Sequence, residues 1–199
     1  MSEIDFEKGG GLVPAIVQHA DTGEVLMLAY MNEEALETTR RTGNVTFFSR
    51  SKQRLWTKGE TSGAVLDFVE LTPDCDRDTL LVRARPAGPA CHTGSKTCFG
   101  ERPGPGVGFL GALQHVIDSR SKADPSESYT AKLLTKGVLN AAQKVGEEGV
   151  ETALAGAAED DAALLSESAD LLFHLTVLLK ARGLRLEDAV RVLEGRNRA

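Results

Sequence analysis

The sequence predicts two domains: an α+β domain built mainly from antiparallel strands, followed by an all-α helical bundle. Three observations lead to this prediction. Seven of the ten aromatic residues and all three cysteines lie before residue 104, and no proline occurs after Pro125. Short β-rich runs fill the first half, whereas apolar residues of the second half recur every three or four positions. Residues 100–108 are so rich in Gly and Pro that they are typical of a linker. We therefore expect domains at 1–103 and 104–199.

The elements of the first half follow from composition and turn signals. Five runs are short, β-rich and bounded by turn residues, which predicts strands at 12–17, 25–30, 45–49, 64–71 and 80–85. One helix is expected between the second and third strands. Asn32 suits its N-cap, Glu33 and Glu34 suit its first turn, and Gly43 suits its end.

The second half predicts helices throughout, because Ala and Leu replace Val and Phe at helical spacing. Gly183 separates the last long helix from a terminal helix that ends near Glu194.

Charge and cysteine content exclude several classes of protein. The net charge is −6 and the pI about 5.3, which argues against a nucleic-acid or anionic-membrane surface. The acidic amino terminus has no apolar run, and no apolar stretch has the length of a membrane span, so we expect neither a secretion signal nor a membrane segment. Three cysteines are too few for a disulfide framework, and an odd number of them cannot all pair. We therefore expect a cytoplasmic protein whose thiols serve chemistry.

Three carboxylates and a thiol fall within five positions, Asp74-Cys75-Asp76-Arg77-Asp78. In an extended segment the carboxylates would share one face about 7 Å apart. Each neighbouring pair would then repel by roughly 2 kcal/mol at an effective dielectric constant of about 20. Arg77, on the opposite face, cannot offset this repulsion, whereas Mg²⁺ prefers carboxylate oxygen. An acidic surface turn explains the segment equally well.

Cys91 and Cys98 lie among Gly, Ser, Thr, Lys and His, which is typical of a loop. Free cysteine is usually a small buried hydrophobe, and six intervening residues do not match a zinc knuckle. Three thiolates with one open position would nevertheless form a catalytic zinc site, where the pKa of bound water falls to about 7. His92 could move protons there, although a lone loop histidine is more often only hydrogen bonded.

Three ordered motifs, Trp56–Gly63, Asp74–Asp78 and Cys91–Phe99, resemble phosphoribosyl-AMP cyclohydrolase over about residues 10–100. That family opens the purine ring of phosphoribosyl-AMP by adding water, a step of histidine biosynthesis. The resemblance implies a zinc site shared between two subunits, in which one subunit contributes Cys75 and its partner contributes Cys91 and Cys98. It implies a magnesium site at Asp74, Asp76 and Asp78. It also implies that five residues lie near the nucleotide: Trp56, Lys58, Glu60, Ser62 and Thr93.

Charged residues gather on two expected helices of the second half. One helix carries four of them within an arc of about 100°: Lys144, Glu147, Glu148 and Glu151. The next carries three within about 60°: Glu167, Asp170 and His174. Leucines share the second arc, so its charges interrupt an apolar stripe, where an unpaired charge is costly. An exposed acidic face explains the first helix alone, but a divalent metal explains both helices better.

The spacing Glu-x-x-Glu, fifteen residues, Glu-x-x-Asp resembles the all-α nucleotide pyrophosphohydrolases. Together with Ser128-Tyr129-Thr130 and His174, it resembles phosphoribosyl-ATP pyrophosphohydrolase over about residues 108–195. The resemblance implies that four carboxylates hold Mg²⁺ on the triphosphate, with Glu147 close by and Lys144 near phosphate: Glu148, Glu151, Glu167 and Asp170. Gly149 and Phe173 depart from the family pattern, which commonly has Ala and Tyr there.

We therefore predict a bifunctional hydrolase of histidine biosynthesis that uses Zn²⁺ and Mg²⁺ and forms a homodimer. The C-terminal domain would convert phosphoribosyl-ATP to phosphoribosyl-AMP and pyrophosphate, and the N-terminal domain would open the purine ring. Two alternatives stay open. The helical half could cleanse non-canonical nucleotides or be inactive, or the thiols could form a structural or redox-responsive zinc site of a binding protein. The lack of a fourth soft ligand argues against the last alternative.

Overall fold

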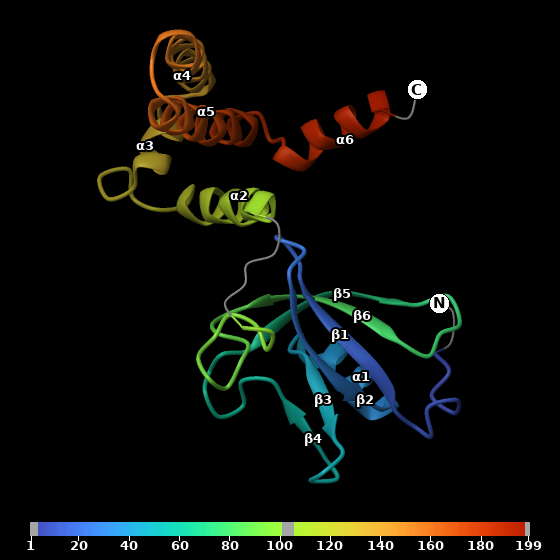
Figure 1. Ribbon diagram of the computed structural model, residues 1–199. Helices are drawn as coiled ribbons and strands as arrows, with labels where there is room; N and C mark the ends of the chain where they lie inside the picture. The colour runs from blue at the N-terminus through green and yellow to red at the C-terminus, as the bar shows by residue number, and fades with distance from the viewer. Residues whose placement is uncertain (1–3, 101–105, 198–199) are drawn as a thin grey trace. The chain divides into compact units, whose positions relative to one another are not determined.

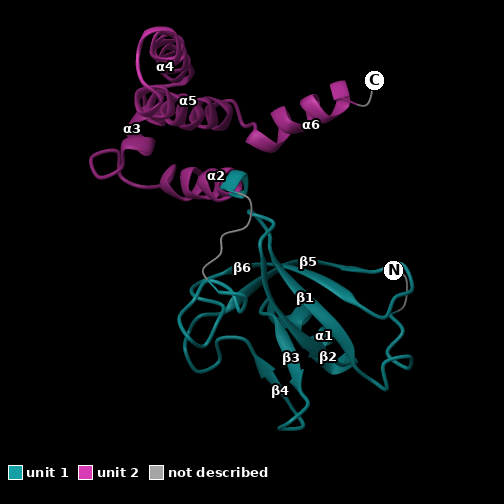
Figure 2. Ribbon diagram, in the orientation of Figure 1, with its two compact units in different colours: residues 1–108 teal, residues 109–199 magenta. Residues whose placement is uncertain are grey.

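The computed structural model describes residues 4–100 and 106–197 of the chain. The chain divides into two compact units, residues 1–108 and 109–199 (Figure 2). The first unit is rich in strands and the second is helical, as the sequence predicts. The predicted boundary between residues 103 and 104 lies outside the described residues, as does most of the predicted linker.

The described part of the first unit contains six strands and one helix (Figure 1). The bounds of the strands are β1 Val13–His19, β2 Val25–Met31, β3 Thr46–Ser49, β4 Arg54–Thr57, β5 Leu66–Pro73 and β6 Leu80–Pro86. A four-stranded sheet has the order β2-β1-β6-β5, and β3 pairs with β4 separately. Among the described strands, only the β1–β6 pairing is parallel, so this part of the fold is mainly antiparallel. All five predicted strands are present, whereas β4 was not predicted.

The core of this unit follows from strand alternation. Val13, Ala15 and Val17 of β1 are fully buried, and so are alternate residues of β6. Helix α1, Glu33–Thr42, packs beside β2 and β3 and has the predicted caps. Asn32 Oδ1 accepts a hydrogen bond from the Ala35 backbone N–H at 2.9 Å. Gly43 ends the helix with a φ of 74°, a conformation that favours glycine.

The second unit contains five helices in its described part, after a short 3₁₀ turn at Gly106–Gly108. Their bounds are α2 Phe109–Arg120, α3 Tyr129–Thr135, α4 Val138–Ala158, α5 Asp161–Ala181 and α6 Leu186–Asn197. Helices α4 and α5 lie side by side (Figure 1), and α2 and α3 also pack on α5. The small core is formed by Ile117, Leu133 and Val177. Gly183 separates α5 from α6, as the sequence predicts.

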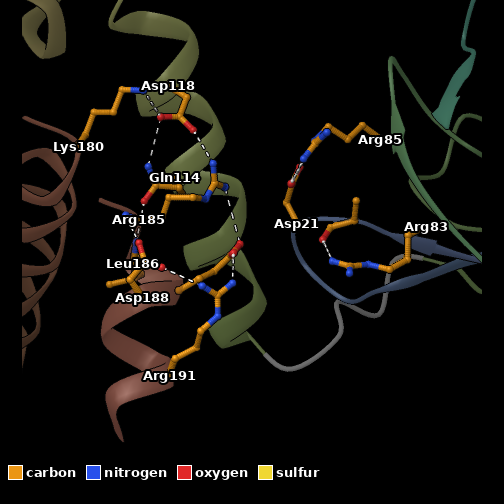
Figure 3. A network of polar contacts seen from close by, with 12 residues as sticks. Asp21, Arg83, Arg85, Gln114, Asp118, Lys180, Arg185, Leu186, Asp188 and Arg191 are labelled. Atoms are coloured by element: carbon orange, nitrogen blue, oxygen red, sulfur yellow. Dashed lines mark hydrogen bonds and ion pairs between the residues drawn. The ribbon is translucent and has the colours of Figure 1, made fainter. Parts of the chain in front are cut away.

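Polar contacts hold α2 to α5 and α6 (Figure 3). Asp118 forms ion pairs with Lys180, at 2.7 Å, and with Arg185, at 3.2 Å. Buried Gln114 accepts a hydrogen bond from the Leu186 backbone N–H at 3.0 Å, which satisfies one of the free donors at the start of α6. In the first unit, Arg85 donates hydrogen bonds to the Asp21 carboxylate from both Nε and Nη2 (Figure 3).

Large apolar side chains stay exposed on α4, α5 and α6, among them Val150, Leu154, Leu165 and Leu193. Within the described residues, α5 alone is long and apolar enough to cross a membrane by length and composition. This differs from the expectation that no such stretch exists. The finding is weak evidence for a span, because core helices of soluble proteins meet the same criterion.

Candidate functional sites in the two units

Most of the predicted nucleotide residues surround one cavity of about 590 Å³ in the strand-rich unit. The predicted residues that line it are Trp56, Lys58, Glu60, Ser62, Cys91, His92 and Cys98. They come from two segments, one running from the end of β4 into the turn after it and one after β6. The fold therefore brings the first and third sequence motifs together around one hollow.

A tight turn shapes the wall that follows β4. Gly59 has a φ of 85°, and a Cβ there would lie only 2.4 Å from the Ala64 carbonyl carbon, so only glycine fits. The Glu60 carboxylate accepts hydrogen bonds from Arg54 at 2.8 Å and from the Thr57 backbone N–H at 3.2 Å. The Arg54 guanidinium holds the pKa of Glu60 below its usual range. Glu60 is thus an ionised group that fixes the turn at the edge of the cavity.

A short loop presents Cys91 and Cys98 to the same cavity. The Thr93 hydroxyl donates a hydrogen bond to Cys91 Sγ at 3.1 Å and lowers the pKa of that thiol. Thr93 acts through this contact and does not line the cavity itself. Partial burial and then the nearby Cys91 raise the pKa of Cys98. His92 is exposed, with Nδ1 3.9 Å from Cys91 Sγ, so it lies beside this thiol.

Cys75 lies apart from the other two thiols. It belongs to the turn before β6, whereas Cys91 and Cys98 follow the end of β6. A strand of seven residues spans roughly 20 Å. Among the described residues, which include all three cysteines, no cluster of metal-ligating atoms contains a thiol. A single chain therefore does not assemble a site of three thiolates.

The carboxylates of Asp74, Asp76 and Asp78 converge, although the segment is not extended. It forms a turn, and Asp74 Oδ1 accepts hydrogen bonds from the backbone N–H groups of Asp78 and Thr79, both at 3.1 Å. Arg77 has a φ of 64°, a left-handed conformation that is uncommon for a residue with a side chain. One oxygen of each aspartate lies within 4.8 Å of the others. The extended geometry considered from the sequence is therefore wrong, and the turn brings the carboxylates closer than a strand would.

A cation already faces this aspartate turn. The Lys8 ammonium contacts Asp76 and lies 2.6 Å from Asp78 Oδ2. The two carboxylates raise the pKa of Lys8, and Lys8 lowers the pKa of Asp76. A backbone hydrogen bond of 2.9 Å from Asp5 to Arg77 holds this N-terminal segment in place. An oxygen-only donor set that attracts an ammonium group fits a hard divalent cation such as Mg²⁺. No local sequence signal pointed to Lys8.

The helical unit gathers three carboxylates between α4 and α5. Glu148, Glu151 and Glu167 each place an oxygen within 4.8 Å of the others. Asp170, also predicted as a ligand, is exposed and lies outside this cluster. Partial removal from water and then the charges of Glu151 and Asp170 raise the pKa of Glu167. Mutual repulsion of this kind is relieved by a divalent cation, so these residues fit Mg²⁺ as well.

Lys144 and Glu147 form a charged group beside this cluster. Lys144 Nζ lies 2.8 Å from Glu147 Oε2 and 3.1 Å from Glu148 Oε1. Glu147 also accepts a hydrogen bond from Gln143 at 2.7 Å, and Lys144 lowers the pKa of Glu147. In this structure Glu147 is therefore paired with its neighbours on α4.

His174 lies behind the carboxylates and is 4% exposed. Its Nε2 is 3.5 Å from Oε1 of Glu148, which is also buried. The rings of Tyr129 and Phe173 meet the imidazole edge to face, with centroids 6.1 and 5.1 Å away. Burial lowers the pKa of His174. The sequence placed His174 on the carboxylate arc but gave it no role.

Comparisons with known proteins match both units. A family model described as phosphoribosyl-AMP cyclohydrolase matches residues 27–100, and one described as phosphoribosyl-ATP pyrophosphohydrolase matches residues 110–197. A protein of Xylella fastidiosa (strain Temecula1) named "Histidine biosynthesis bifunctional protein HisIE" is 61% identical over 198 residues, which cover 100% of this chain and 95% of that protein. Proteins of the same name from Xanthomonas axonopodis pv. citri and Escherichia coli K12 are 59% and 55% identical. These matches cover 99% and 98% of this chain, and 94% and 96% of the two relatives.

Proposed function

This chain belongs to the family of bifunctional histidine-biosynthesis proteins that join a phosphoribosyl-AMP cyclohydrolase to a phosphoribosyl-ATP pyrophosphohydrolase, and from this premise we propose how its residues divide the two reactions. The chain is a bifunctional hydrolase that acts on small nucleotides. We assign ring opening to a domain at 1–103 and pyrophosphate release to a domain at 104–199. The observation that carries this assignment is the presence of a separate cluster of potential metal ligands in each compact unit. Chain order is then the reverse of reaction order.

For pyrophosphate release, the carboxylates facing each other from α4 and α5 hold magnesium on the triphosphate. The proposed ligands are Glu148, Glu151, Glu167 and Asp170, with Glu147 close by. Magnesium, when bound, offsets the charge of the triphosphate. Water attacks the phosphorus next to the ribose and pyrophosphate leaves, so the residues act by positioning and by charge. Lys144 is the cation of α4 nearest to the cluster and is our candidate for a phosphate contact.

For ring opening, Cys91 and Cys98 at the cavity hold zinc together with Cys75 of a second chain. Zinc, when bound, supplies a Lewis acid that activates water at neutral pH. The Thr93 hydroxyl favours the thiolate of Cys91, the form that binds metal. Ring opening requires one proton to leave the water and one to reach the ring nitrogen, and His92 is our candidate for moving them.

The substrate of this reaction occupies the cavity between the two motif segments. One wall is formed by the end of β4 and the turn that follows it, with Trp56, Lys58, Glu60 and Ser62. The aspartate turn, with Asp74, Asp76 and Asp78, holds a magnesium ion that helps to position the substrate of a neighbouring subunit. Because Cys75 belongs to this same turn, one contact between two chains would deliver both the third thiolate and the magnesium ligands.

Both sites lead us to propose a homodimer. The separation of Cys75 from Cys91 by the length of β6 supports a zinc site shared between two chains. Apolar side chains of α4 and α5, including Leu154 and Leu165, are exposed. This supports the packing of a second chain's helices against them, which would complete the bundle.

A coupled assay that starts from phosphoribosyl-ATP tests the assignment, with Zn²⁺ and Mg²⁺ supplied separately. We expect Cys98→Ala to abolish ring opening while pyrophosphate release continues, and Glu148→Gln to abolish pyrophosphate release while added phosphoribosyl-AMP is still opened. Loss of both activities in either variant would contradict the division into two domains. Faster turnover of ordinary or damaged nucleoside triphosphates than of phosphoribosyl-ATP would instead favour a house-cleaning role for the helical half.

A further inference from the structure

Two nitrogen atoms lie close to the same oxygen atom of Glu148. Lys144 Nζ lies 3.1 Å and His174 Nε2 lies 3.5 Å from Glu148 Oε1. The side chains of Glu148 and His174 are 8% and 5% exposed. A carboxylate oxygen of Glu148 also lies within 4.8 Å of oxygens of Glu151 and Glu167, so the residue that contacts His174 belongs to the carboxylate cluster.

We propose that His174 is a positioning residue for pyrophosphate release: its Nε2–H holds the Glu148 carboxylate in the orientation that binds the divalent cation. This inference rests on the proposed function of the helical unit. His174 itself touches neither substrate nor cation, and it acts through Glu148. Outer partners of this kind fix the orientation of a metal ligand and commonly change metal affinity when they are removed.

The other ring nitrogen of His174 indicates which tautomer is present. Nδ1 is buried and has no hydrogen-bond partner among the described residues. A buried N–H without a partner is rarer in proteins than a buried acceptor without one. In a neutral imidazole one nitrogen carries the proton and the other a lone pair. The proton therefore lies on Nε2, where a carboxylate is present to accept it.

The surroundings of the ring also separate a positioning role from simple packing. Tyr129 and Phe173 pack edge to face on the imidazole, so an apolar side chain would fill the same space without leaving an unpaired nitrogen. A buried polar group that lacks one of its partners costs free energy. The contact with Glu148 is the one polar interaction of the ring in the described residues that offsets this cost.

Calorimetry of Mn²⁺ binding to the intact chain tests the proposal, with Mn²⁺ as an oxygen-preferring substitute for Mg²⁺. Glu148→Gln identifies which binding event belongs to the helical unit. We expect His174→Leu to weaken that event on the order of tenfold, because the orienting donor is lost. His174→Gln, which keeps a donor at a similar reach, stays close to the unmodified chain. His115→Leu, the same change at an exposed histidine of α2, has no effect.

Unchanged Mn²⁺ binding in His174→Leu overturns the proposal, and so does equal weakening in the Leu and Gln variants. The double variant Glu148→Gln/His174→Leu should bind no more weakly than Glu148→Gln alone, and a further loss likewise overturns the proposal. Because His174→Leu can fail to fold, ¹⁵N chemical shifts of the unmodified chain provide a second measurement. We expect the Nε2–H tautomer, with the signal identified by its absence from His174→Gln, and an Nδ1–H tautomer overturns the proposal.

Pyrophosphate release by the unmodified chain is measured in parallel, so that two failures can be distinguished. If the unmodified chain releases pyrophosphate normally but His174→Leu leaves Mn²⁺ binding unchanged, the positioning role alone is contradicted. Weakened Mn²⁺ binding in His174→Leu, with no release from phosphoribosyl-ATP by the unmodified chain, supports the positioning role and contradicts the proposed function.

Discussion

The ammonium nitrogen of Lys8 lies 2.6 Å from Oδ2 of Asp78, so an N-terminal residue neutralises part of the aspartate turn before β6. A divalent cation bound to Asp76 and Asp78 must displace this ammonium group or share the carboxylates with it. We therefore expect Lys8→Met to tighten Mn²⁺ binding at the aspartate turn severalfold, because a competing cation is removed. Calorimetry of the full chain measures the change, and Asp76→Asn identifies the binding event concerned.

The control for Lys8 is Lys52→Met, which removes the same charge from the exposed turn between β3 and β4 of the same unit. It should leave this binding event unchanged, because Lys8 is the cation that contacts Asp76 and Asp78 and the effect of a more distant exposed charge is largely screened by salt. Weaker Mn²⁺ binding in Lys8→Met would mean that Lys8 organises the carboxylates instead of competing for them.

The conformation of Arg77 leads to a prediction about stability. Its φ of 64° costs a residue with a Cβ on the order of 1 kcal/mol, and glycine does not have this cost. We expect Arg77→Gly to leave the free energy of unfolding close to that of the unmodified chain, because the relieved strain offsets the greater freedom of glycine in the unfolded state. Arg77→Val should destabilise the unit by about 1 kcal/mol or more.

Trp56 is the only tryptophan of the chain, so its fluorescence during denaturation reports on the strand-rich unit. Equal stabilities of the Gly and Val variants would show that the left-handed conformation at position 77 is not needed for the turn.

Local sequence signals predicted those features of the fold that depend on neighbouring residues. The caps of α1 are an example, because Asn32 and Gly43 act on backbone groups within one turn of the helix. The four-residue strand β4 was missed because it is short and begins next to the polar run Ser51-Lys52-Gln53. Its stability comes from pairing with β3, including the packing of Trp56 on Phe47.

Prediction of the sites had a similar limit. The spacing of Glu148, Glu151 and Glu167 along two helices was enough to expect that they meet. The approach of Lys8 to the aspartate turn was not predictable, because it joins residues 68 positions apart. The pairing of His174 with Glu148 depends on how α4 lies against α5, which the period of a single helix does not determine.

The raised pKa of Glu167 predicts a pH dependence of stability in the metal-free protein. Because its folded-state pKa lies above the unfolded value, the native state binds the proton more tightly. The contribution of Glu167 to stability is therefore most favourable below the unfolded pKa and is lost as the pH rises through the folded pKa. Removing this titration with Glu167→Gln should stabilise the metal-free helical unit more at pH 7 than at pH 4.

Circular dichroism melting curves of the two chains, recorded with a chelator at both pH values, measure this difference. Comparison with Glu167→Gln removes the opposite contribution of Glu147, whose pKa is lowered by Lys144 and Gln143, because both chains keep these residues. Added Mg²⁺ should reverse the order at pH 7, because the unmodified cluster then binds the cation and is stabilised by it. A difference between the chains that does not change with pH would contradict the assigned repulsion.

The distance between Cys75 and the other thiols predicts that two inactive variants restore each other. Cys75→Ser and Cys98→Ser should each abolish ring opening when purified alone. In a mixed dimer with two shared sites, one site combines both substitutions and the other contains neither. After subunits exchange at random, half of the dimers are mixed and each has one intact site, so roughly a quarter of the original activity should return.

A mixture of Cys91→Ser and Cys98→Ser should stay inactive, because those two thiols come from the same chain and every site then lacks one of them. Continued inactivity of the first mixture, despite subunit exchange demonstrated by mass spectrometry, would contradict a zinc site shared between chains.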